Sequence, residues 1–332
     1  MSEDREIAPH VSVVVFSRDS KEALIRCLTS LARLDYPNIT VFLADSGSTA
    51  YDPHAVESLF DGLILLETEG YPGAARCKNA ALARILKMRR TEFVLLLDED
   101  TIVHPRLVRH LIEAHDPQRG WDILQPAVYE LESPETLHGY GGRMNFYTGG
   151  VSMNRRLPRA ADPADEAAPI DVAFSYAMFT HRHVFDTVGF FDEWLFAQDS
   201  DDVDICLRAP RRNYGVAVLP GAIVWLAEGR RHAASRDPFE RGRSRSLLVR
   251  RYGRLHHRIV YLLLSPLMGA GMVAVEAMRG RPAAGLSAAM GMLRGLTMSL
   301  RGAGPGEAEE PDPEEWDERA LPGKGQGSAS HR

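Results

Sequence analysis

The chain has 332 residues, of which 45% are hydrophobic and 25% are charged, and its formal net charge at pH 7 is −6. These values are ordinary for a globular protein with room for one large α/β domain and appended segments, and they argue against a general nucleic-acid-binding protein. The three cysteines are scattered without a Cys-x-x-Cys pair, so neither a zinc site nor a disulfide framework is indicated, and a reducing compartment fits. Residues 1–10 carry charges of both signs without an apolar core, so we expect a short N-terminal extension and no signal peptide.

Residues 11–128 alternate between short apolar runs and segments with helical spacing. The apolar runs are expected to form strands at residues 11–16, 39–44, 63–66, 93–97 and 122–128. Helices are expected after the first and third of these strands. Strand–helix–strand units with short connections are right-handed and parallel, so this part of the chain predicts a mostly parallel, Rossmann-like sheet.

Polar residues follow the second and third predicted strands. Asp45 comes directly after the second strand, where a carboxylate can accept hydrogen bonds from a ribose or a base edge; an Asx-turn is the equally good alternative. Gly73 precedes a helix in which Arg76 and Asn79 are three residues apart near the N-terminus, a place suited to an anion. The chain has no Walker motif and no glycine-rich loop after the first strand, so P-loop and dehydrogenase chemistry are excluded.

Three acidic residues follow the fourth predicted strand, which has five consecutive apolar residues and is therefore typical of a parallel strand buried on both faces. Open α/β sheets bind ligands at the carboxyl ends of such strands. In an extended backbone Asp98 and Asp100 would share a face and could converge on Mg²⁺ or Mn²⁺, which would hold a nucleotide diphosphate. The alternative is that Asp98, Glu99 and Asp100 are ordinary turn and helix-cap residues.

The next segments are less regular until a second acidic cluster. Residues 139–154 predict a long loop or hairpin, and residues 157–169 predict an inserted segment that is either a lid or a plain surface loop. Residues 199–204 then hold four aspartates in six positions, more than helix capping requires. Crowded carboxylates raise one another's proton affinity, which favours a general base here; acids that merely complement a helix dipole are the alternative.

The order of these segments resembles that of the inverting family 2 glycosyltransferases, which have the GT-A fold. The resemblance covers residues 11–225 and is closest to the rhamnosyltransferase-like enzymes of bacterial cell envelopes. Besides the first strand and its helix, it rests on residues 43–48, 73–79, 95–100, 189–193 and 201–208. It implies a GT-A catalytic domain at 11–228, with a nucleotide-sugar half at 11–128 and an acceptor half at 129–228.

The resemblance also implies a reaction and a set of site residues. A sugar would move from a UDP-, dTDP- or GDP-sugar to an acceptor hydroxyl with inversion, Asp202 taking the proton and Asp201 supporting it. Asp98 and Asp100 would hold Mg²⁺ or Mn²⁺. The nucleotide sugar would bind to Phe16, Ser17, Arg18, Asp45, Gly73, Arg76, Asn79, Asp98 and Glu99. The acceptor, a glycan, a lipid-linked group or a small molecule, would bind to Ser175, Tyr176 and Trp194.

One departure from the family concerns the metal. Family members often have a histidine directly after the strand that ends at Trp225, where this chain has Leu226. His232 in the following loop is a candidate substitute. The departure keeps open a second hypothesis, in which the chain is a catalytically degenerate GT-A protein that binds sugars or nucleotides or serves as a scaffold.

The C-terminal part divides into three segments. Residues 229–258 are arginine-rich, and we expect this segment to face a diphosphate, anionic lipid headgroups or solvent. Residues 259–301 predict two apolar helices; the uncharged run ends at Glu276, short of the roughly 20 residues that span a bilayer. These helices would lie on a membrane surface, on the catalytic domain or on a partner subunit in a homodimer. Residues 302–332 predict disorder. We therefore expect a cytoplasmic protein in peripheral contact with the inner membrane.

Overall fold

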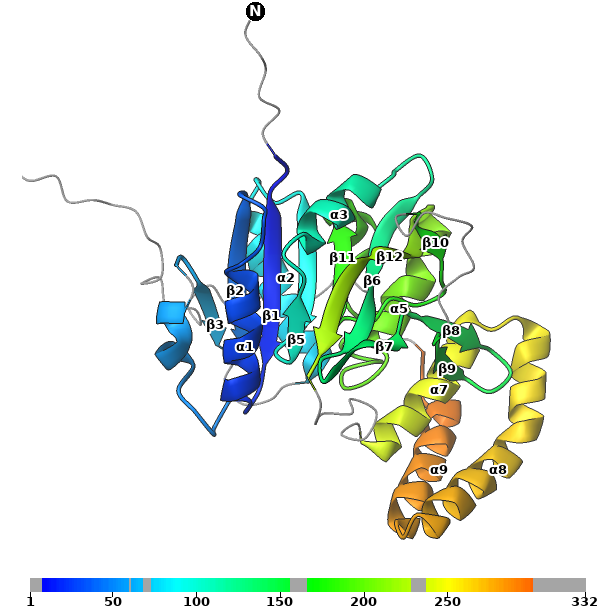
Figure 1. The fold of residues 1–332 in the computed structure, drawn as a ribbon. Helices are drawn as coiled ribbons and strands as arrows, with labels where there is room; N and C mark the ends of the chain where they lie inside the picture. The colour runs from blue at the N-terminus through cyan, green and yellow to red at the C-terminus, as the bar shows by residue number, and fades with distance from the viewer. Residues whose placement is uncertain (1–7, 60, 68–72, 156–165, 228–236, 301–332) are drawn as a thin grey trace, which may run out of the picture.

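The protein has a central mixed sheet flanked by helices, with further helices at its C-terminal end (Figure 1). The computed structural model describes residues 8–59, 61–67, 73–155, 166–227 and 237–300. Most of the predicted N-terminal extension, most of the predicted insertion, His232 and the predicted tail lie outside the described residues. The α/β fold class predicted from the sequence is confirmed.

Four parallel strands form the N-terminal part of the sheet, in the order β3 (Ile64–Glu67), β2 (Ile39–Asp45), β1 (Val11–Ser17) and β4 (Phe93–Asp98). Alternate side chains of a strand point to opposite faces, so each face needs its own cover. Helix α1 (Lys21–Leu31) packs against the face that carries Val13, whereas α2 (Ala74–Lys87) packs against the face that carries Val14. These are the parallel βαβ units expected from the sequence, with helices on both faces of the sheet.

The rest of the sheet is mixed. Strand β11 (Ala177–His181) runs antiparallel between β4 and β6 (Trp121–Glu130), and β12 (Gly215–Leu226) follows, parallel to β6. Three further strands border this half of the sheet, namely β5 (Thr101–Val103), β7 (Ser133–Gly139) and β10 (Ala168–Pro169). The predicted loop or hairpin at 139–154 is a hairpin of β8 (Gly142–Asn145) and β9 (Gly150–Met153).

Short helices connect these strands. They are the 3-10 helix η1 (Pro53–Leu59), α3 (Leu107–Ala114), α4 (Arg182–Val188), α5 (Asp201–Arg208) and the 3-10 helix η2 (Ala209–Arg212). Proline inside an α-helix removes a backbone hydrogen bond, which is why α5 gives way to η2 at Pro210. Helix α5 is therefore short, and it begins at the second acidic cluster.

Three helices form the C-terminal end, α7 (Pro238–Tyr252), α8 (Leu255–Met278) and α9 (Pro282–Thr297), drawn in yellow to orange in Figure 1. Helix α8 has 24 residues and continues through Pro266. By length and composition alone, α8 is long and apolar enough to cross a membrane. The prediction that this stretch is too short to span a bilayer was therefore wrong on length, because the helix begins before the uncharged run and continues beyond it.

Candidate active site

Several of the predicted site residues lie at the carboxyl edge of the parallel strands. In the strand register, Ser17 lies opposite Asp45, and Phe16 lies opposite Asp98. Strand β11 runs the other way and starts at the same edge, because Ala177 lies opposite Leu97. The segment just before β11 therefore meets the ends of β1, β2 and β4.

The first acidic cluster does not have the geometry assumed from the sequence. Strand β4 ends at Asp98, and Glu99 and Asp100 form a turn, so the premise that Asp98 and Asp100 share one face of an extended strand was wrong. The Glu99 carboxylate accepts hydrogen bonds from the Ser17 hydroxyl (2.6 Å) and from the backbone N–H of Arg18 (2.9 Å). Glu99 and Asp100 are buried, whereas Asp98 is half-buried at the edge. Asp98 is thus the most accessible of the three acids.

Asp45 is held by its own loop. Its carboxylate accepts hydrogen bonds from the backbone N–H (2.8 Å) and the hydroxyl of Ser48, and the side chain is buried. Ser17, one strand away, also exchanges a hydrogen bond with the hydroxyl of Tyr51 (2.7 Å). The residues predicted to hold the base and the ribose therefore lie together at this edge of the sheet. The hydrogen bonds between Asp45 and Ser48 are those of an Asx-turn, which was the alternative interpretation of Asp45.

The start of helix α2 lies against the loop that precedes the second acidic cluster. Gly73 has φ +113°, and a Cβ there would lie 2.8 Å from the carbonyl oxygen of Ala197, so a larger residue would collide with backbone. Arg76 is exposed, but Asn79 is buried. The Asn79 side-chain amide donates a hydrogen bond to the Phe191 carbonyl oxygen (2.9 Å) and accepts one from the Phe191 backbone N–H (3.0 Å). The structure does not bring Arg76 and Asn79 to one surface.

The second acidic cluster begins helix α5. Asp201 and Asp202 are its first two residues, and both are buried. The Asp202 carboxylate accepts hydrogen bonds from the backbone N–H of Val203 (2.8 Å) and, at 3.3 Å, from that of Ser175. These bonds fix the orientation of Asp202 toward the segment before β11, where Ser175 and Tyr176 were predicted to bind the acceptor.

A lysine that the sequence analysis did not single out lies between the acidic clusters. The Lys78 ammonium group is 2.6 Å from Asp201 Oδ2 and 2.7 Å from the Ser175 hydroxyl, and it is buried over the ring of Phe191. Burial lowers the pKa of Lys78, but the carboxylates of Asp201, Asp202 and Asp98 together outweigh burial and raise the pKa above its usual value. Lys78 therefore stays charged, and its field reaches both acidic clusters.

Backbone contacts complete the connection between the two clusters. The carbonyl oxygen of Tyr176 accepts hydrogen bonds from the backbone N–H of Asp98 (3.3 Å) and from the hydroxyl of Thr101 (2.9 Å). The preceding residue, Ser175, contacts both Lys78 and Asp202. The structure thus brings Asp98, Lys78 and Asp202 to one edge of the sheet.

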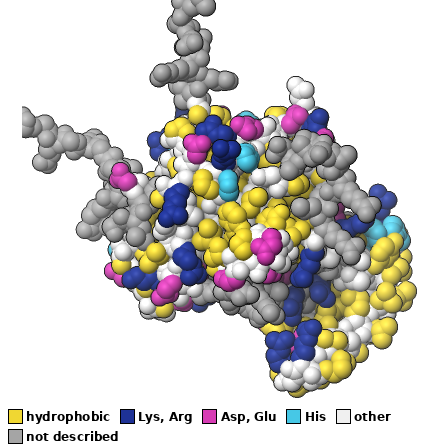
Figure 2. Space-filling view, viewed as in Figure 1, with side chains coloured by type: hydrophobic (Ala, Val, Ile, Leu, Met, Phe, Trp, Pro, Cys, Tyr) yellow, Lys and Arg dark blue, Asp and Glu magenta, His cyan; other side chains and the backbone are white. Residues whose placement is uncertain are grey.

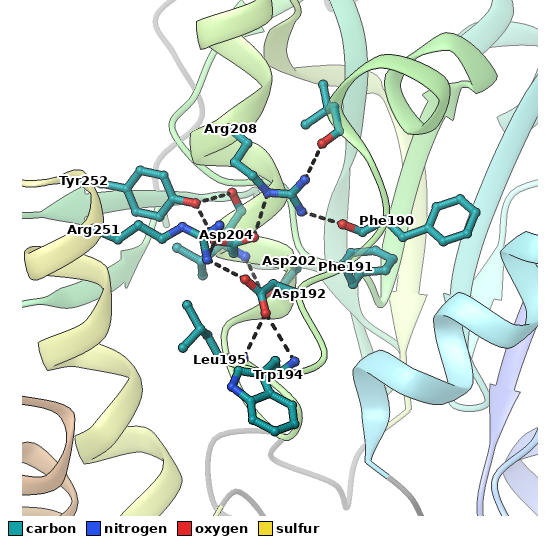
Figure 3. A network of polar contacts seen from close by, with 12 residues as sticks. Phe190, Phe191, Asp192, Trp194, Leu195, Asp202, Asp204, Arg208, Arg251 and Tyr252 are labelled. Atoms are coloured by element: carbon teal, nitrogen blue, oxygen red, sulfur yellow. Dashed lines mark hydrogen bonds and ion pairs between the residues drawn. The ribbon is translucent and has the colours of Figure 1, made fainter. Parts of the chain in front are cut away.

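The remaining acid of α5 belongs to a structural network that fastens α7 to the site (Figure 3). Asp204 pairs with Arg208 (2.8 Å) and with Arg251 (3.4 Å), and the Tyr252 hydroxyl donates a hydrogen bond to it. Arg251 also pairs with Asp192 (2.5 Å). Burial raises the pKa of Asp204, although the two arginines act in the opposite direction. The Arg251 side chain is thus engaged inside the protein, not with a diphosphate or a lipid headgroup.

The other predicted residues have varied surroundings. Trp194 is 61% exposed on the loop before α5, whereas Tyr176 is buried and stacks on Phe174 with 5.5 Å between ring centroids. Leu226 lies opposite Thr101, and the N–H of Ala227 bonds the carbonyl of Asp100 (3.2 Å). Leu226, where the resemblance led us to expect histidine, therefore lies next to the first acidic cluster.

The donor groups at this edge allow a limited test of metal binding. Among the residues that the structure describes, no group of three or more His, Cys, Asp or Glu side chains could hold a metal ion. Mg²⁺ in nucleotide sites, however, is usually held by one or two carboxylates, water and the phosphates themselves. Asp98, half-buried at the edge, fits that arrangement, whereas Asp100 is buried.

Known proteins are similar to this chain in sequence or in fold. The β-monoglucosyldiacylglycerol synthase of Nostoc sp. is 27% identical over 207 residues, which are 60% of this chain and 41% of the relative, so the chain spans about two fifths of that protein. The structure of GalNAc-T7 with UDP, GalNAc and Mn²⁺ superposes with a TM-score of 0.60 at 15% identity, covering 74% of this chain and 48% of that one.

A second solved structure matches over nearly its whole length. The mannosyltransferase PcManGT of Pyrobaculum calidifontis, in complex with GDP-Man and Mn²⁺, superposes with a TM-score of 0.54 at 16% identity over 88% of this chain and 90% of that one. These neighbours show that the fold is GT-A. The model of the glycosyltransferase-like family 2 matches residues 8–243, more than two thirds of the sequence. The chain therefore belongs to the glycosyltransferase-like family 2.

Proposed function

We propose that the chain is an inverting glycosyltransferase that moves a hexosyl or deoxyhexosyl group from a nucleoside-diphosphate sugar to an acceptor hydroxyl. One observation carries the proposal: Lys78 pairs with Asp201 while Asp202, its neighbour, is oriented by Ser175 at the same sheet edge as Asp98. The Lys78 ammonium group balances the charge of Asp201, which leaves the Asp202 carboxylate to accept a proton. Membership of family 2 supports the reaction class.

The chemistry assigned to these residues is a single displacement. Asp202 accepts the proton of the acceptor hydroxyl as its oxygen attacks the anomeric carbon, and the nucleoside diphosphate leaves from the opposite side, which inverts that carbon. Asp201 serves as the partner of Lys78 and not as the base. The positive charge of Lys78 reaches the Asp98 edge, where negative charge develops on the departing diphosphate.

A divalent cation, Mg²⁺ or Mn²⁺, is part of this proposal. Asp98 would hold it, and when bound it supplies Lewis-acid stabilisation of the diphosphate. We expect Asp98→Asn to weaken nucleotide-sugar affinity in the presence of Mn²⁺, measured by calorimetric titration with and without a chelator. Asp45→Asn is the comparison, because it disturbs the same sheet edge through the Ser48 turn and leaves Asp98 in place. Equal affinity of Asp98→Asn and wild type in both conditions would remove the metal from the proposal.

The donor nucleotide is uridine, deoxythymidine or guanosine diphosphate, in line with the UDP and GDP-Man bound by the structural neighbours. The acceptor is an envelope glycan, a lipid-linked group or a small molecule, in keeping with a rhamnosyltransferase-like bacterial enzyme. The name of the Nostoc relative, a glucosyldiacylglycerol synthase, favours a lipid-linked acceptor. A cytoplasmic location with peripheral contact to the inner membrane, and assembly as a homodimer, complete the proposal.

A degenerate GT-A protein that only binds sugars is the second candidate, favoured by Leu226 beside the acidic cluster. A panel of UDP-, dTDP- and GDP-sugars, incubated with the full chain and Mn²⁺ and assayed for released nucleotide, separates the two. We expect slow hydrolysis of one donor, because water replaces the missing acceptor, and its loss with a chelator. Donor binding without hydrolysis, and without transfer to any acceptor in a lipid extract, would favour the degenerate protein.

A further inference from the structure

The outer faces of α8 and α9 carry a group of exposed apolar side chains. Figure 2 shows hydrophobic side chains along the right-hand margin of the molecule, over α8. Leu263 is 73% exposed and Leu293 is 64% exposed, whereas a core leucine such as Leu95 is fully buried. We define this outer face by Leu262, Leu263, Leu267, Leu286, Met290 and Leu293. Large apolar side chains that are exposed together on neighbouring helices mark an interaction site.

Helix α7 packs on the opposite side of both helices. The Ser246 hydroxyl on α7 bonds the Tyr261 hydroxyl of α8 (2.8 Å) and the Met292 carbonyl of α9 (2.8 Å). Gly291 of α9 lies so close to Phe239 of α7 that a Cβ would be 2.0 Å from its carbonyl oxygen. On α9 the exposed residues are at i, i+4 and i+7 from Leu286, a stripe distinct from the positions that meet α7. The outer face therefore remains uncovered by the described part of the chain.

The charged residues around this outer face indicate what kind of partner binds there. Residues 254–300 contain five arginines and one glutamate, a formal charge of +4 in a chain of net charge −6. All five arginines are exposed, and they include Arg254 and Arg258 at the start of α8 and Arg279 and Arg281 at the turn into α9. An apolar face bordered by arginines is complementary to an anionic lipid surface.

Charge and packing also indicate how α8 and α9 would lie relative to a bilayer. Helix α8 as a whole is long enough to cross a membrane, but His256, His257 and Arg258 lie in its first turn. The part of α8 without charged residues or histidines, residues 259–275, is about 26 Å long, less than the hydrocarbon thickness of about 30 Å. Glu276 pairs with Arg279 (3.0 Å) and Arg281 (2.8 Å), so the turn between α8 and α9 is charged and would resist entry into hydrocarbon. Helix α9 is fastened along the arginine-rich α7, and α7 is bonded to the catalytic domain through Ser244 and the Asp199 carbonyl (3.1 Å).

We propose that the outer face of α8 and α9 docks in the headgroup region of an anionic bilayer with both helices parallel to its plane, so that neither helix spans it. The proposal deepens the proposed function by naming the surface that would bring the site to a lipid-linked acceptor. Its evidence is independent of catalysis. Because the Arg251 network joins α7 to α5, the docked helices would also hold the start of α5 at a fixed height above the membrane.

Vesicle flotation of the full chain tests the docking. We expect the chain to float with vesicles containing phosphatidylglycerol, to float at least tenfold less with phosphatidylcholine alone, and to be released by high salt in part. Leu263→Glu and Leu293→Glu should each lose flotation without a change in melting temperature. Thr29→Glu on the exposed side of α1 adds the same charge elsewhere and should float like wild type. Normal flotation of both leucine variants, or a soluble dimer that Leu263→Glu dissociates, would overturn the proposal.

Labelling at the helical turn tests the orientation. The described cysteines Cys27, Cys77 and Cys206 are all buried, so Arg279→Cys provides a distinct reactive thiol. With protein added to sealed vesicles, a membrane-impermeant maleimide should label this thiol as fully as after permeabilisation. Protection that only permeabilisation relieves would show a spanning helix and overturn the in-plane arrangement. Donor hydrolysis measured without vesicles should be unchanged in Leu263→Glu, so failure of docking and failure of the proposed function are read separately.

Discussion

Replacing Asp202 by asparagine is expected to lower the rate of sugar transfer by about 10²- to 10⁴-fold, the usual contribution of a general base. The amide keeps the shape of the side chain and can still accept the hydrogen bond from Val203, but it cannot take a proton. Nucleotide-sugar affinity should change little, because the donor is bound at the other acidic cluster. Steady-state kinetics with the donor found by the hydrolysis panel, together with calorimetric titration of that donor, measures both effects.

Two control variants separate the loss of a general base from other effects of removing a carboxylate. Asp186→Asn removes a carboxylate from the surface of α4, where it pairs with Arg182, and should leave transfer unchanged. Asp204→Asn lies on the same helix as Asp202 but disturbs the network of Arg208 and Arg251, so it should lower the melting temperature. If Asp202→Asn retains full activity, the base is another group, and the proposed displacement would have to be reassigned.

Local sequence patterns were sufficient to predict the N-terminal half of the fold. Five consecutive apolar residues identified β4 as a central strand, and helical spacing identified α1 and α2 as its covers. The carboxyl ends of parallel strands meet at one edge, so the neighbourhood of Ser17, Asp45 and Asp98 followed from topology. These features depend on interactions between residues near one another in the chain or on the regular geometry of βαβ units.

Features that depend on distant partners could not be predicted in the same way. Nothing local to β11 shows that it runs antiparallel between β4 and β6, because that pairing joins strands far apart in sequence. The shared face assumed for Asp98 and Asp100 failed because the strand ends at Asp98 and the next two residues form a turn. The arginine-rich segment gave no sign that Arg251 would be engaged with Asp192 and Asp204.

The clearest omission is Lys78, and the sequence did contain a signal for it. Ala75, Leu82 and Ile85 are buried on α2 at helical spacing, and Lys78 occupies the same stripe. A lysine within an apolar stripe is buried only when a charge is there to receive it. The sequence could not name that charge, because Asp201 lies 123 residues further along the chain.

The Lys78–Asp201 pair is expected to have the largest effect on stability. Lys78→Met keeps the length of the side chain but leaves Asp201 buried without its cation, and removal of one partner of a buried ion pair costs about 3–5 kcal/mol. Urea denaturation should therefore show a much lower midpoint for Lys78→Met. The double variant Lys78→Met/Asp201→Asn removes both charges and should recover a large part of the loss, whereas independent residues would give additive losses.

The same variants separate support of the fold from support of the chemistry. If Lys78 also stabilises the departing diphosphate, the double variant should be stable yet slow, because the positive charge that reaches Asp98 is absent. Lys78→Arg keeps the charge, but its planar guanidinium cannot reproduce the contacts to both Asp201 and Ser175, so we expect intermediate stability and intermediate transfer. A double variant with wild-type turnover would confine Lys78 to a structural role. A Lys78→Met protein as stable as wild type would contradict the prediction and show that the Lys78–Asp201 pair contributes little to stability.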